Sequence, residues 1–294
     1  MPTPPARRRH NNTPPAGGTD LSFAGGVFFW QLPELPHSRD APDIRREENM
    51  ANALIAMLCF SAAEIIFVPW FLHAEYPKRN YKSLTLKMIC SALFVGVGIA
   101  CMALAGHTGI YSWIILAALV CSAVGDFLLH YEDVIENHDY FFYGMIAFGI
   151  AHLLYLTDYI YILTVKLPEI KPFSWLELVA LVIALGIAQM GNKMFHLKPG
   201  KLKIPLYVYT TILICTVIHA CYLAVQYYLA DLTNHALVLL FLGGGGILFA
   251  TSDALIGILH FGDKKPRPMR VVNIVTYYAA QCLLAGTILF LGGL

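Results

Sequence analysis

The chain has 294 residues, of which 57% are hydrophobic and only 13% are charged. Soluble domains carry about 25% charged residues, so this composition excludes an ordinary soluble globular protein and indicates a chain surrounded by lipid. The formal net charge is +1, and the lysines and arginines are scattered through tails and loops, a distribution that argues against nucleic-acid binding.

Residues 1–48 form a separate region that is rich in Pro, Arg and Asn and includes the segment PPARRRHNNTPPAGG. This composition predicts a disordered N-terminal tail. The apolar stretch at 21–32 is too short to cross a membrane, and PELPHSRD follows it instead of a small-residue cleavage pattern. We therefore predict no signal peptide there, and we assign residues 49–294 to a single domain.

Eight apolar segments follow the tail, each close to the ~20 residues that a helix needs to cross the hydrocarbon core of a bilayer. Helices satisfy every backbone polar group within one segment, and the connections are short. We therefore predict an all-α integral membrane protein, with eight transmembrane helices in one bundle. The segments are 50–72, 84–105, 110–129, 140–163, 175–194, 204–229, 236–260 and 271–293.

The loops differ in their content of lysine and arginine, which predicts the orientation of the bundle. The positive-inside rule places the basic loops in the cytosol and both termini on the other side, although Arg45 and Arg46 argue the opposite way. The loops after the first, fifth and seventh segments carry most of these residues: Lys78, Arg79 and Lys82; Lys193, Lys198, Lys201 and Lys203; Lys264, Lys265, Arg267 and Arg270.

Two aspartates lie inside apolar segments: Asp126 in LAALVCSAVGDFLL and Asp253 in GGGGILFATSDALIGIL. A carboxylate at membrane depth costs several kcal/mol unless it is protonated, paired or hydrated, so it marks a functional site by default. The alternative interpretation is that each aspartate is a hydrogen-bond partner in helix packing.

Further polar residues fall in the same half of the bundle, toward the basic loops. Tyr277 and Gln281 lie on one helix face, at i and i+4. His152 lies deeper, near the middle of the fourth segment. This convergence predicts a polar pocket open to one membrane face. The residues that join the aspartates in this layer are Glu64, Lys87, Tyr207, Tyr209, Tyr277 and Gln281.

Several of these residues also have structural interpretations. Lys87 is close enough to a segment end to extend its ammonium to the interface. His152 follows Phe148 at i+4 and is compatible with a core histidine, and Tyr277 with an interfacial belt. The run GGGG at 243–246 indicates close helix packing, because no P-loop residues follow it. No ligand spacing supports a metal site built from the aspartates and the histidine, and the seven cysteines show no C-x-x-C spacing.

Two carboxyl groups in a pocket of low dielectric divide their roles, because two neighbouring carboxylates do not easily both ionise. One then serves as a general acid, and the other remains an anion. This division suits hydrolysis through a cation-like intermediate, and it suits proton-coupled transport equally well. The physical chemistry of the residues leaves both functions open.

The segments SAVGDFLL (122–129), GMIAFGIAHLLYL (144–156), ILFATSDALIGI (247–258) and TYYAAQCLLA (276–285) resemble the YhhN-type lysoplasmalogenase family of integral membrane enzymes, particularly its animal members. Their order and their distribution over the third, fourth, seventh and eighth segments are also similar. The resemblance covers roughly residues 50–294 and does not extend to the tail.

The resemblance implies an enzyme of the endoplasmic reticulum membrane that hydrolyses the vinyl-ether bond of a lysoplasmalogen without a cofactor. The products are a fatty aldehyde and glycerophosphocholine or glycerophosphoethanolamine. A lysophospholipid substrate and membrane lipids are the implied partners, and a homodimer is left open. Asp126 and Asp253 correspond to the two intramembrane aspartates of the family, and we expect Asp126 to act as the base and Asp253 as the acid.

The expected substrate-binding residues are Lys87, His152, Tyr155, Tyr207, Tyr277 and Gln281. Lys87 departs from the family pattern, since Met88 follows it where many members have proline. Three alternatives remain at this point: a proton-coupled transporter or channel, a lipid-binding sensor without turnover, and a different membrane lipid hydrolase with the same fold.

Overall fold

A computed structural model of the chain describes residues 44–76, 78–106, 109–263 and 265–291. The predicted tail, with its apolar stretch at 21–32, lies outside these residues except for positions 44–48. Those positions belong to the first helix, which begins at Ile44. The helix thus begins before residue 49, where the sequence analysis places the start of the domain; Arg and Glu favour helices, and no proline interrupts them between Ile44 and residue 49.

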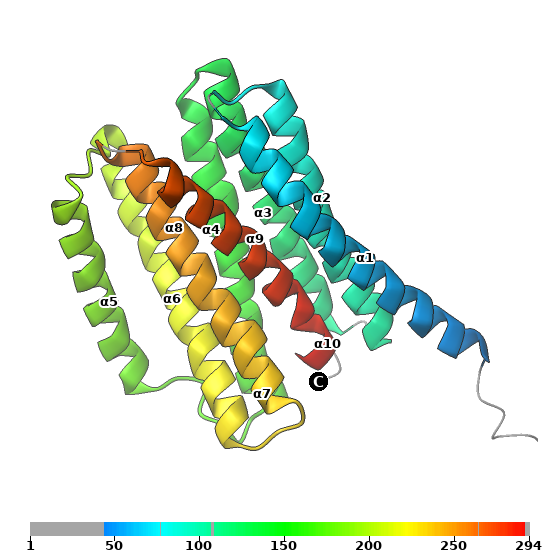
Figure 1. Cartoon of the computed structure of the whole chain (residues 1–294). Helices are drawn as coiled ribbons and strands as arrows, with labels where there is room; N and C mark the ends of the chain where they lie inside the picture. Colours follow the sequence, from blue (N-terminus) through cyan, green and yellow to red (C-terminus); the bar gives the residue numbers. More distant parts are fainter. Residues whose placement is uncertain (1–43, 77, 107–108, 264, 292–294) are drawn as a thin grey trace, which may run out of the picture. The chain divides into compact units, whose positions relative to one another are not determined.

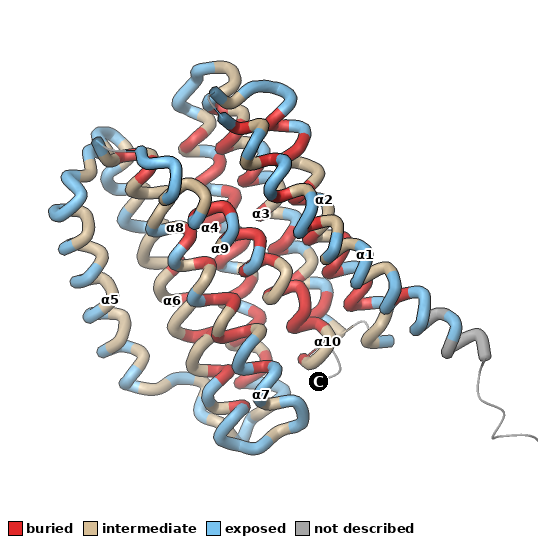
Figure 2. The backbone as a smooth tube through the Cα atoms, viewed as in Figure 1, coloured by how far each residue is buried: buried red, intermediate tan, exposed pale blue. Residues whose placement is uncertain are grey.

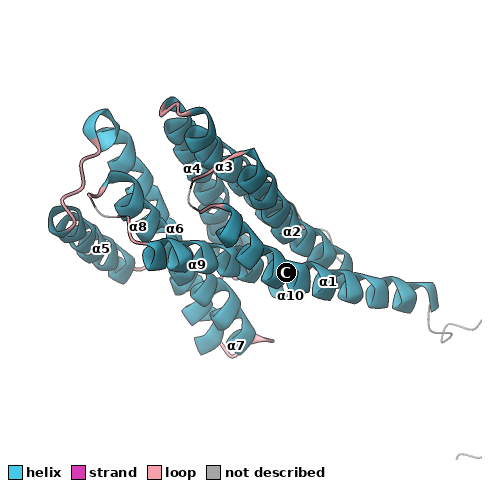
Figure 3. Ribbon diagram, turned by 45° about the horizontal axis from the view of Figure 1, so that its top comes forward, coloured by secondary structure: helices cyan, strands magenta, loops and turns pink. Residues whose placement is uncertain are grey.

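The described residues form helices and turns and contain no strand (Figure 3). The prediction of an all-α fold is confirmed. The elements are α1 (Ile44–Ala74), α2 (Tyr81–Ala105), α3 (Ile110–Ile135), α4 (Asp139–Tyr161), η1 (Ile162–Lys166), α5 (Trp175–Met194), η2 (Gly200–Leu202), α6 (Lys203–Leu229), α7 (His235–Val238), η3 (Leu239–Gly244), α8 (Gly245–Phe261), α9 (Arg267–Gly286) and α10 (Ile288–Leu291).

Eight continuous helical segments in the described part of the chain are long and apolar enough to cross a membrane. The fourth joins α4 to η1, the sixth joins η2 to α6, the seventh runs from α7 through η3 to α8, and the eighth joins α9 to α10. The ends of these segments lie within six residues of the predicted ones, and the largest difference is at the end of the third segment. The chain is therefore an integral membrane protein.

The interior of the bundle lies between α2, α3, α4, α6, α8 and α9 (Figures 1 and 2). Helix α5 stands at the edge beside α6 and has no buried residue. A capping box between Ser174 and Glu177 begins α5, and Glu177 Oε2 also lies 2.6 Å from His219 Nδ1 on α6. Most of the surface of α5 is therefore left to lipid.

The start of α2 is fixed by a capping box, in which Asn80 and Ser83 exchange side-chain and backbone hydrogen bonds. Ser83 Oγ also lies 2.8 Å from His130 Nε2 near the end of α3. These contacts fix α2 against α3 at the level where Lys87 and Ser91 enter the bundle.

Glycines allow α3 and α4 to approach closely. A Cβ at Gly125 would lie 2.6 Å from the Phe148 ring, and a Cβ at Gly144 would lie 2.7 Å from Leu129 Cδ2. In the run GGGG, a Cβ at Gly245 would lie 3.2 Å from Leu284 on α9. Close packing at Gly245 agrees with the sequence interpretation of the GGGG run.

We expect Gly144→Ala to destabilise the bundle by about 1–3 kcal/mol, because overpacking forces neighbouring side chains from their positions. The new methyl would also lie 3.3 Å from the backbone nitrogen of Leu129, which has little freedom to move. Gly186→Ala on α5 is the matched control, since no atom lies within 4 Å of its Cβ position. Thermal unfolding in detergent measures both, and equal midpoints for the two variants would contradict the close approach.

Candidate active site

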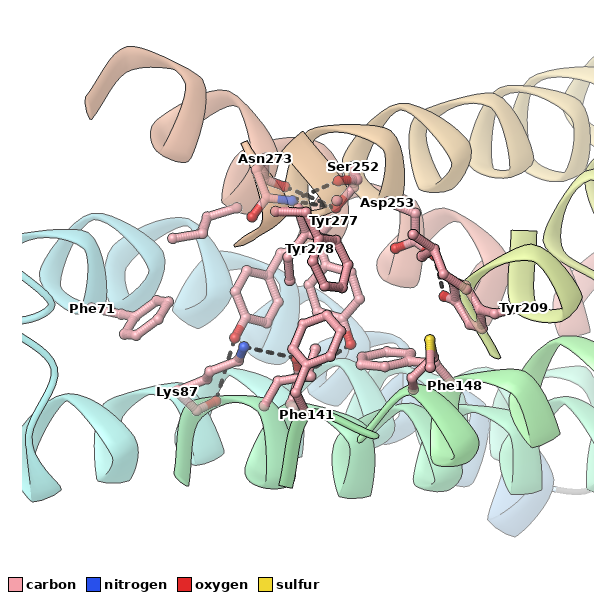
Figure 4. A pocket seen from close by; sticks show the side chains of 18 residues that line it. Phe71, Lys87, Phe141, Phe148, Tyr209, Ser252, Asp253, Asn273, Tyr277 and Tyr278 are labelled. Atoms are coloured by element: carbon pink, nitrogen blue, oxygen red, sulfur yellow. Dashed lines mark hydrogen bonds and ion pairs between the residues drawn. The ribbon is translucent and has the colours of Figure 1, made fainter. Parts of the chain in front are cut away.

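Both intramembrane aspartates line one pocket, which lies between α1, α2, α3, α4, α6, α8 and α9 (Figure 4). It encloses about 70 Å³, room for a few water molecules. The volume rises to about 670 Å³ when all space between the lining atoms is counted, including the part that is open to the surroundings. The lining residues are Phe71, Lys87, Asp126, Leu129, Phe141, Met145, Phe148, Leu206, Tyr209, Ser252, Asp253, Ile256, Gly257, Phe261, Asn273, Ile274, Tyr277 and Tyr278.

Asp126, on α3, is buried and receives three donors. Lys87 Nζ lies 3.1 Å from its Oδ1, while Ser91 Oγ and Tyr277 OH each donate to its Oδ2 at 2.7 Å. Lys87 and Ser91 are one helical turn apart on α2, so one face of that helix supplies donors to both carboxylate oxygens. An ammonium and two hydroxyl donors compensate the charge of a carboxylate at membrane depth.

A chain of hydrogen bonds supports Asp126 from behind the pocket wall. Gln281 Nε2 donates to Tyr277 OH at 3.1 Å, and Tyr155 OH reaches Gln281 Oε1 at 3.4 Å. Tyr155 and Gln281 are both buried and do not line the pocket. Their contacts orient Tyr277, and through it the carboxylate of Asp126.

Asp253, on α8, has different surroundings. Tyr209 OH on α6 donates to its Oδ2. His152 Nε2 on α4 lies 3.7 Å from the same oxygen, which is beyond hydrogen-bond range. Neither ring nitrogen of His152 has a hydrogen-bond partner among the described residues. No lysine or arginine of the described chain forms an ion pair with Asp253, so its charge is less compensated than that of Asp126.

The two carboxyl groups therefore belong to separate hydrogen-bond networks within one pocket. In Figure 4, Lys87 lies to one side of the aromatic rings of Tyr277 and Tyr278, and the pair formed by Asp253 and Tyr209 lies to the other. Phe148 and Tyr277 pack edge to face, with their ring centroids 6.0 Å apart. A pocket with one compensated and one less compensated carboxyl group can both donate and accept protons.

Helices α8 and α9 are joined next to Asp253. Asn273 Nδ2 donates to Ser252 O at 2.7 Å and to Ser252 Oγ at 3.0 Å, and Ser252 Oγ lies 3.1 Å from Asn273 O. Ser252 precedes Asp253, and Asn273 lies one turn before Tyr277. This reciprocal contact fixes the position of Asp253 relative to the tyrosine that binds Asp126.

The structure brings four of the predicted site residues to the pocket, namely Asp126, Asp253, Lys87 and Tyr277. His152, Tyr155 and Gln281 lie just behind its wall. The expected substrate-binding residue Tyr207 lies elsewhere, because its hydroxyl donates to Gln189 on α5 at 3.0 Å. Glu64 is buried on α1, and neither of its carboxyl oxygens has a hydrogen-bond partner among the described residues; it does not line the pocket.

The sequence interpretation did not identify Ser91 or Asn273 as site residues, and although it placed both Tyr207 and Tyr209 in the polar layer, it chose Tyr207 as the substrate-binding residue. The i,i+4 spacing of Ser91 from Lys87 is a signal that was present in the sequence. Within the described ranges, no group of three or more His, Cys, Asp or Glu side chains is arranged to hold a metal ion.

Comparisons with known proteins give one matching family and several curated relatives. The model of the YhhN family matches residues 97–288, a range that includes both aspartates, His152, Tyr277 and Gln281 but excludes Lys87. Lysoplasmalogenase TMEM86B of Rattus norvegicus is 31% identical over 179 residues, which cover 60% of this chain and 61% of the relative.

Lysoplasmalogenase TMEM86B of Mus musculus is 31% identical over 183 residues, covering 60% of this chain and 63% of the relative. The matched part thus spans less than two thirds of the length of these curated relatives. No solved structure matches the chain. The family match extends over more than half of the chain and contains most of the pocket, and it confirms the resemblance found in the sequence: the chain belongs to the YhhN family.

Proposed function

We propose that this protein is a lysoplasmalogenase, which hydrolyses the vinyl-ether bond of a lysoplasmalogen. The two carboxyl groups in one membrane-embedded pocket, with unequal compensation of their charges, are the observation that carries the proposal. The names of the mammalian relatives support the same activity. The largely aromatic and aliphatic lining suits an alkenyl chain.

The reaction begins with protonation of the vinyl-ether carbon that is not bound to oxygen, which gives an oxocarbenium ion. Asp253 is the group that we assign to this step, because no lysine or arginine of the described chain stabilises its anion. Asp126 remains an anion beside Lys87 and stabilises the cation that forms.

Water then adds to the cationic carbon and gives a hemiacetal, while Asp126 accepts one proton of that water. The hemiacetal collapses to a fatty aldehyde, and the glycerol oxygen leaves with a proton as an alcohol. One water is consumed, and the proton taken by Asp126 balances the one given by Asp253.

Release of aldehyde by the purified protein tests the proposal. We expect aldehyde from a defined lysoplasmalogen in detergent, and no fatty acid from the matched ester-linked lysophospholipid. The ester control matters because an unspecific lipid hydrolase would cleave both bonds. Correctly folded protein that releases no aldehyde would contradict the proposal and would favour a transporter or a sensor.

The location that the resemblance implies, the membrane of the endoplasmic reticulum, is part of this proposal. The eight apolar helices support a membrane location in general. Fluorescence of the tagged chain with a marker of that organelle tests the finer statement, and a plasma-membrane distribution would contradict it.

A further inference from the structure

A second cavity adjoins the pocket on the side of the basic loops, at the ends of α3 and α8 and the beginning of α9. It shares Leu129, Phe141, Ile256 and Asn273 with the pocket, so the two cavities lie next to each other on either side of these residues. We call this second cavity the vestibule. It is lined by Arg79, Leu129, Glu132, Asp133, Phe141, Ile256, Leu259, His260, Lys265, Arg270 and Asn273.

Two of the vestibule cations have unused hydrogen-bonding capacity. The Arg270 guanidinium approaches Glu75 only to 3.8 Å, and it donates no hydrogen bond to any other described residue. The Lys265 ammonium likewise has no hydrogen bond or ion pair within the described chain. Arg79, in contrast, is held by Glu75 at 2.5 Å and by Asp133. Arg270 and Lys265 are therefore available to an anion that enters the vestibule.

The vestibule also carries two carboxylates. Glu132 is almost fully buried and lies 2.9 Å from His138 Nδ1; this hydrogen bond raises the pKa of His138 above its usual value. Asp133 is half-exposed and accepts a hydrogen bond from Arg79. A cavity lined by both cations and carboxylates matches a zwitterion better than a ligand with a net negative charge.

Lys87 does not offer the same anion site. Its ammonium is 3.1 Å from Asp126 Oδ1, and its side chain is 11% exposed. A phosphate bound there would compete with the carboxylate for the one ammonium and would add a second negative charge next to it.

We propose that the vestibule binds the zwitterionic headgroup of a lysophospholipid, with the phosphate at Arg270 and Lys265 and the ammonium toward Glu132 and Asp133. The inference rests on the proposed function, and it assigns a location and residues to the part of the substrate that the pocket does not hold. In this assignment the alkenyl ether lies in the pocket, and the glycerol backbone passes between the side chains that the two cavities share, which move aside when the lipid binds.

Binding of a non-hydrolysable probe tests the vestibule without turnover. The probe is an alkyl-ether lysophosphocholine, compared with the alkylglycerol of the same chain length, which lacks the headgroup. We expect Arg270→Gln and Lys265→Gln each to weaken binding of the lysophosphocholine about tenfold, as the loss of a charge-assisted hydrogen bond does. Binding of the alkylglycerol should not change.

Lys198→Gln is the matched control, since it removes a cation on the same side of the bundle, where Lys198 pairs with exposed Asp263 at 2.8 Å. We expect it to bind both probes as the wild type does. Equal binding of the lysophosphocholine by the wild type and the double variant Arg270→Gln/Lys265→Gln would overturn the vestibule assignment. An equal loss for both probes would also overturn it, because the effect would then not depend on the headgroup.

Two further measurements distinguish a zwitterion site from a simple anion site, and the vestibule assignment from the proposed function. Inorganic phosphate at equal concentration should not displace the lysophosphocholine, whereas displacement by phosphate alone would show a simple anion site and overturn the zwitterion assignment. Aldehyde release is measured on the same preparations. Headgroup-dependent binding without aldehyde release would contradict the proposed function and support the vestibule assignment. Aldehyde release without headgroup-dependent binding would support the proposed function and contradict the vestibule assignment.

Discussion

Asp126→Asn and Asp253→Asn should each lower kcat for aldehyde release by about 10³-fold, the size of effect expected when a general acid or base is removed. Asparagine keeps the volume of the side chain and its hydrogen-bonding oxygen, but it neither carries a proton for the vinyl ether nor takes one from water. Turnover within a few-fold of the wild type in both variants would eliminate the mechanism with two carboxyl groups.

Asp158→Asn provides the control for a buried aspartate outside the pocket. Asp158 is fully buried in α4, and its carboxyl oxygens have no hydrogen-bond partner among the described residues. We expect this variant to retain wild-type kcat. A loss of activity equal to that of the pocket variants would show that any neutralised intramembrane aspartate disables the protein.

The pH dependence of kcat/KM distinguishes the roles of the two aspartates. The base must be ionised, and the acid must be protonated, so the wild-type profile should be bell-shaped. The residual activity of Asp126→Asn should lose the acidic limb, while that of Asp253→Asn should lose the alkaline limb. The opposite assignment of the limbs would exchange the two roles.

Lys87→Met should destabilise the protein by about 3–5 kcal/mol, because it leaves the buried Asp126 carboxylate without its cation. The double variant Lys87→Met/Asp126→Asn should recover most of that loss, since neither charge then remains. Unfolding in detergent, analysed as a double-mutant cycle, gives the coupling between the two side chains.

The control is Lys203→Met, which removes an exposed lysine from the start of α6 on the same side of the bundle. It should leave stability within about 0.5 kcal/mol of the wild type. If Lys87→Met instead raised KM and left stability unchanged, Lys87 would act as a substrate ligand, as the sequence suggested, and not as the partner of Asp126.

The convergence of Asp126, Asp253, Lys87 and Tyr277 was predictable because each segment spans the membrane once. Position within a segment therefore gives depth, and residues at equal depth on neighbouring helices are candidates for contact. The positions of the eight segments followed from the same reasoning, with no need for tertiary information.

Rotation about the helix axis was harder to predict than depth. Tyr207 and Tyr209 enter α6 at similar depths, but they point about 200° apart around an α-helix. In a transmembrane helix the side that faces lipid and the side that faces the bundle are similarly apolar. The sequence therefore did not show which of the two tyrosines faces the bundle. Tyr209 binds Asp253, and Tyr207 binds Gln189 on α5.

The partner of Lys87 was not predictable for a related reason. Its depth suited both an ammonium that extends to the interface and one that turns inward. The inward position depends on Ser91 and on Tyr277, which hold the Asp126 carboxylate in place from a different helix each. This arrangement needs side chains from three helices to meet. It depends on how the helices pack, which the sequence of a single helix does not show.

The polar pocket and the vestibule lie on the side of the basic loops, and this position determines which leaflet supplies the lipid. A lipid enters such a site from the leaflet at its own level, so only one of the two leaflets is depleted directly. The other leaflet contributes at the rate at which single-chain lipids cross the bilayer. In the proposed reaction the two products also separate: the water-soluble product leaves to the aqueous phase, and the aldehyde remains among the acyl chains of that leaflet.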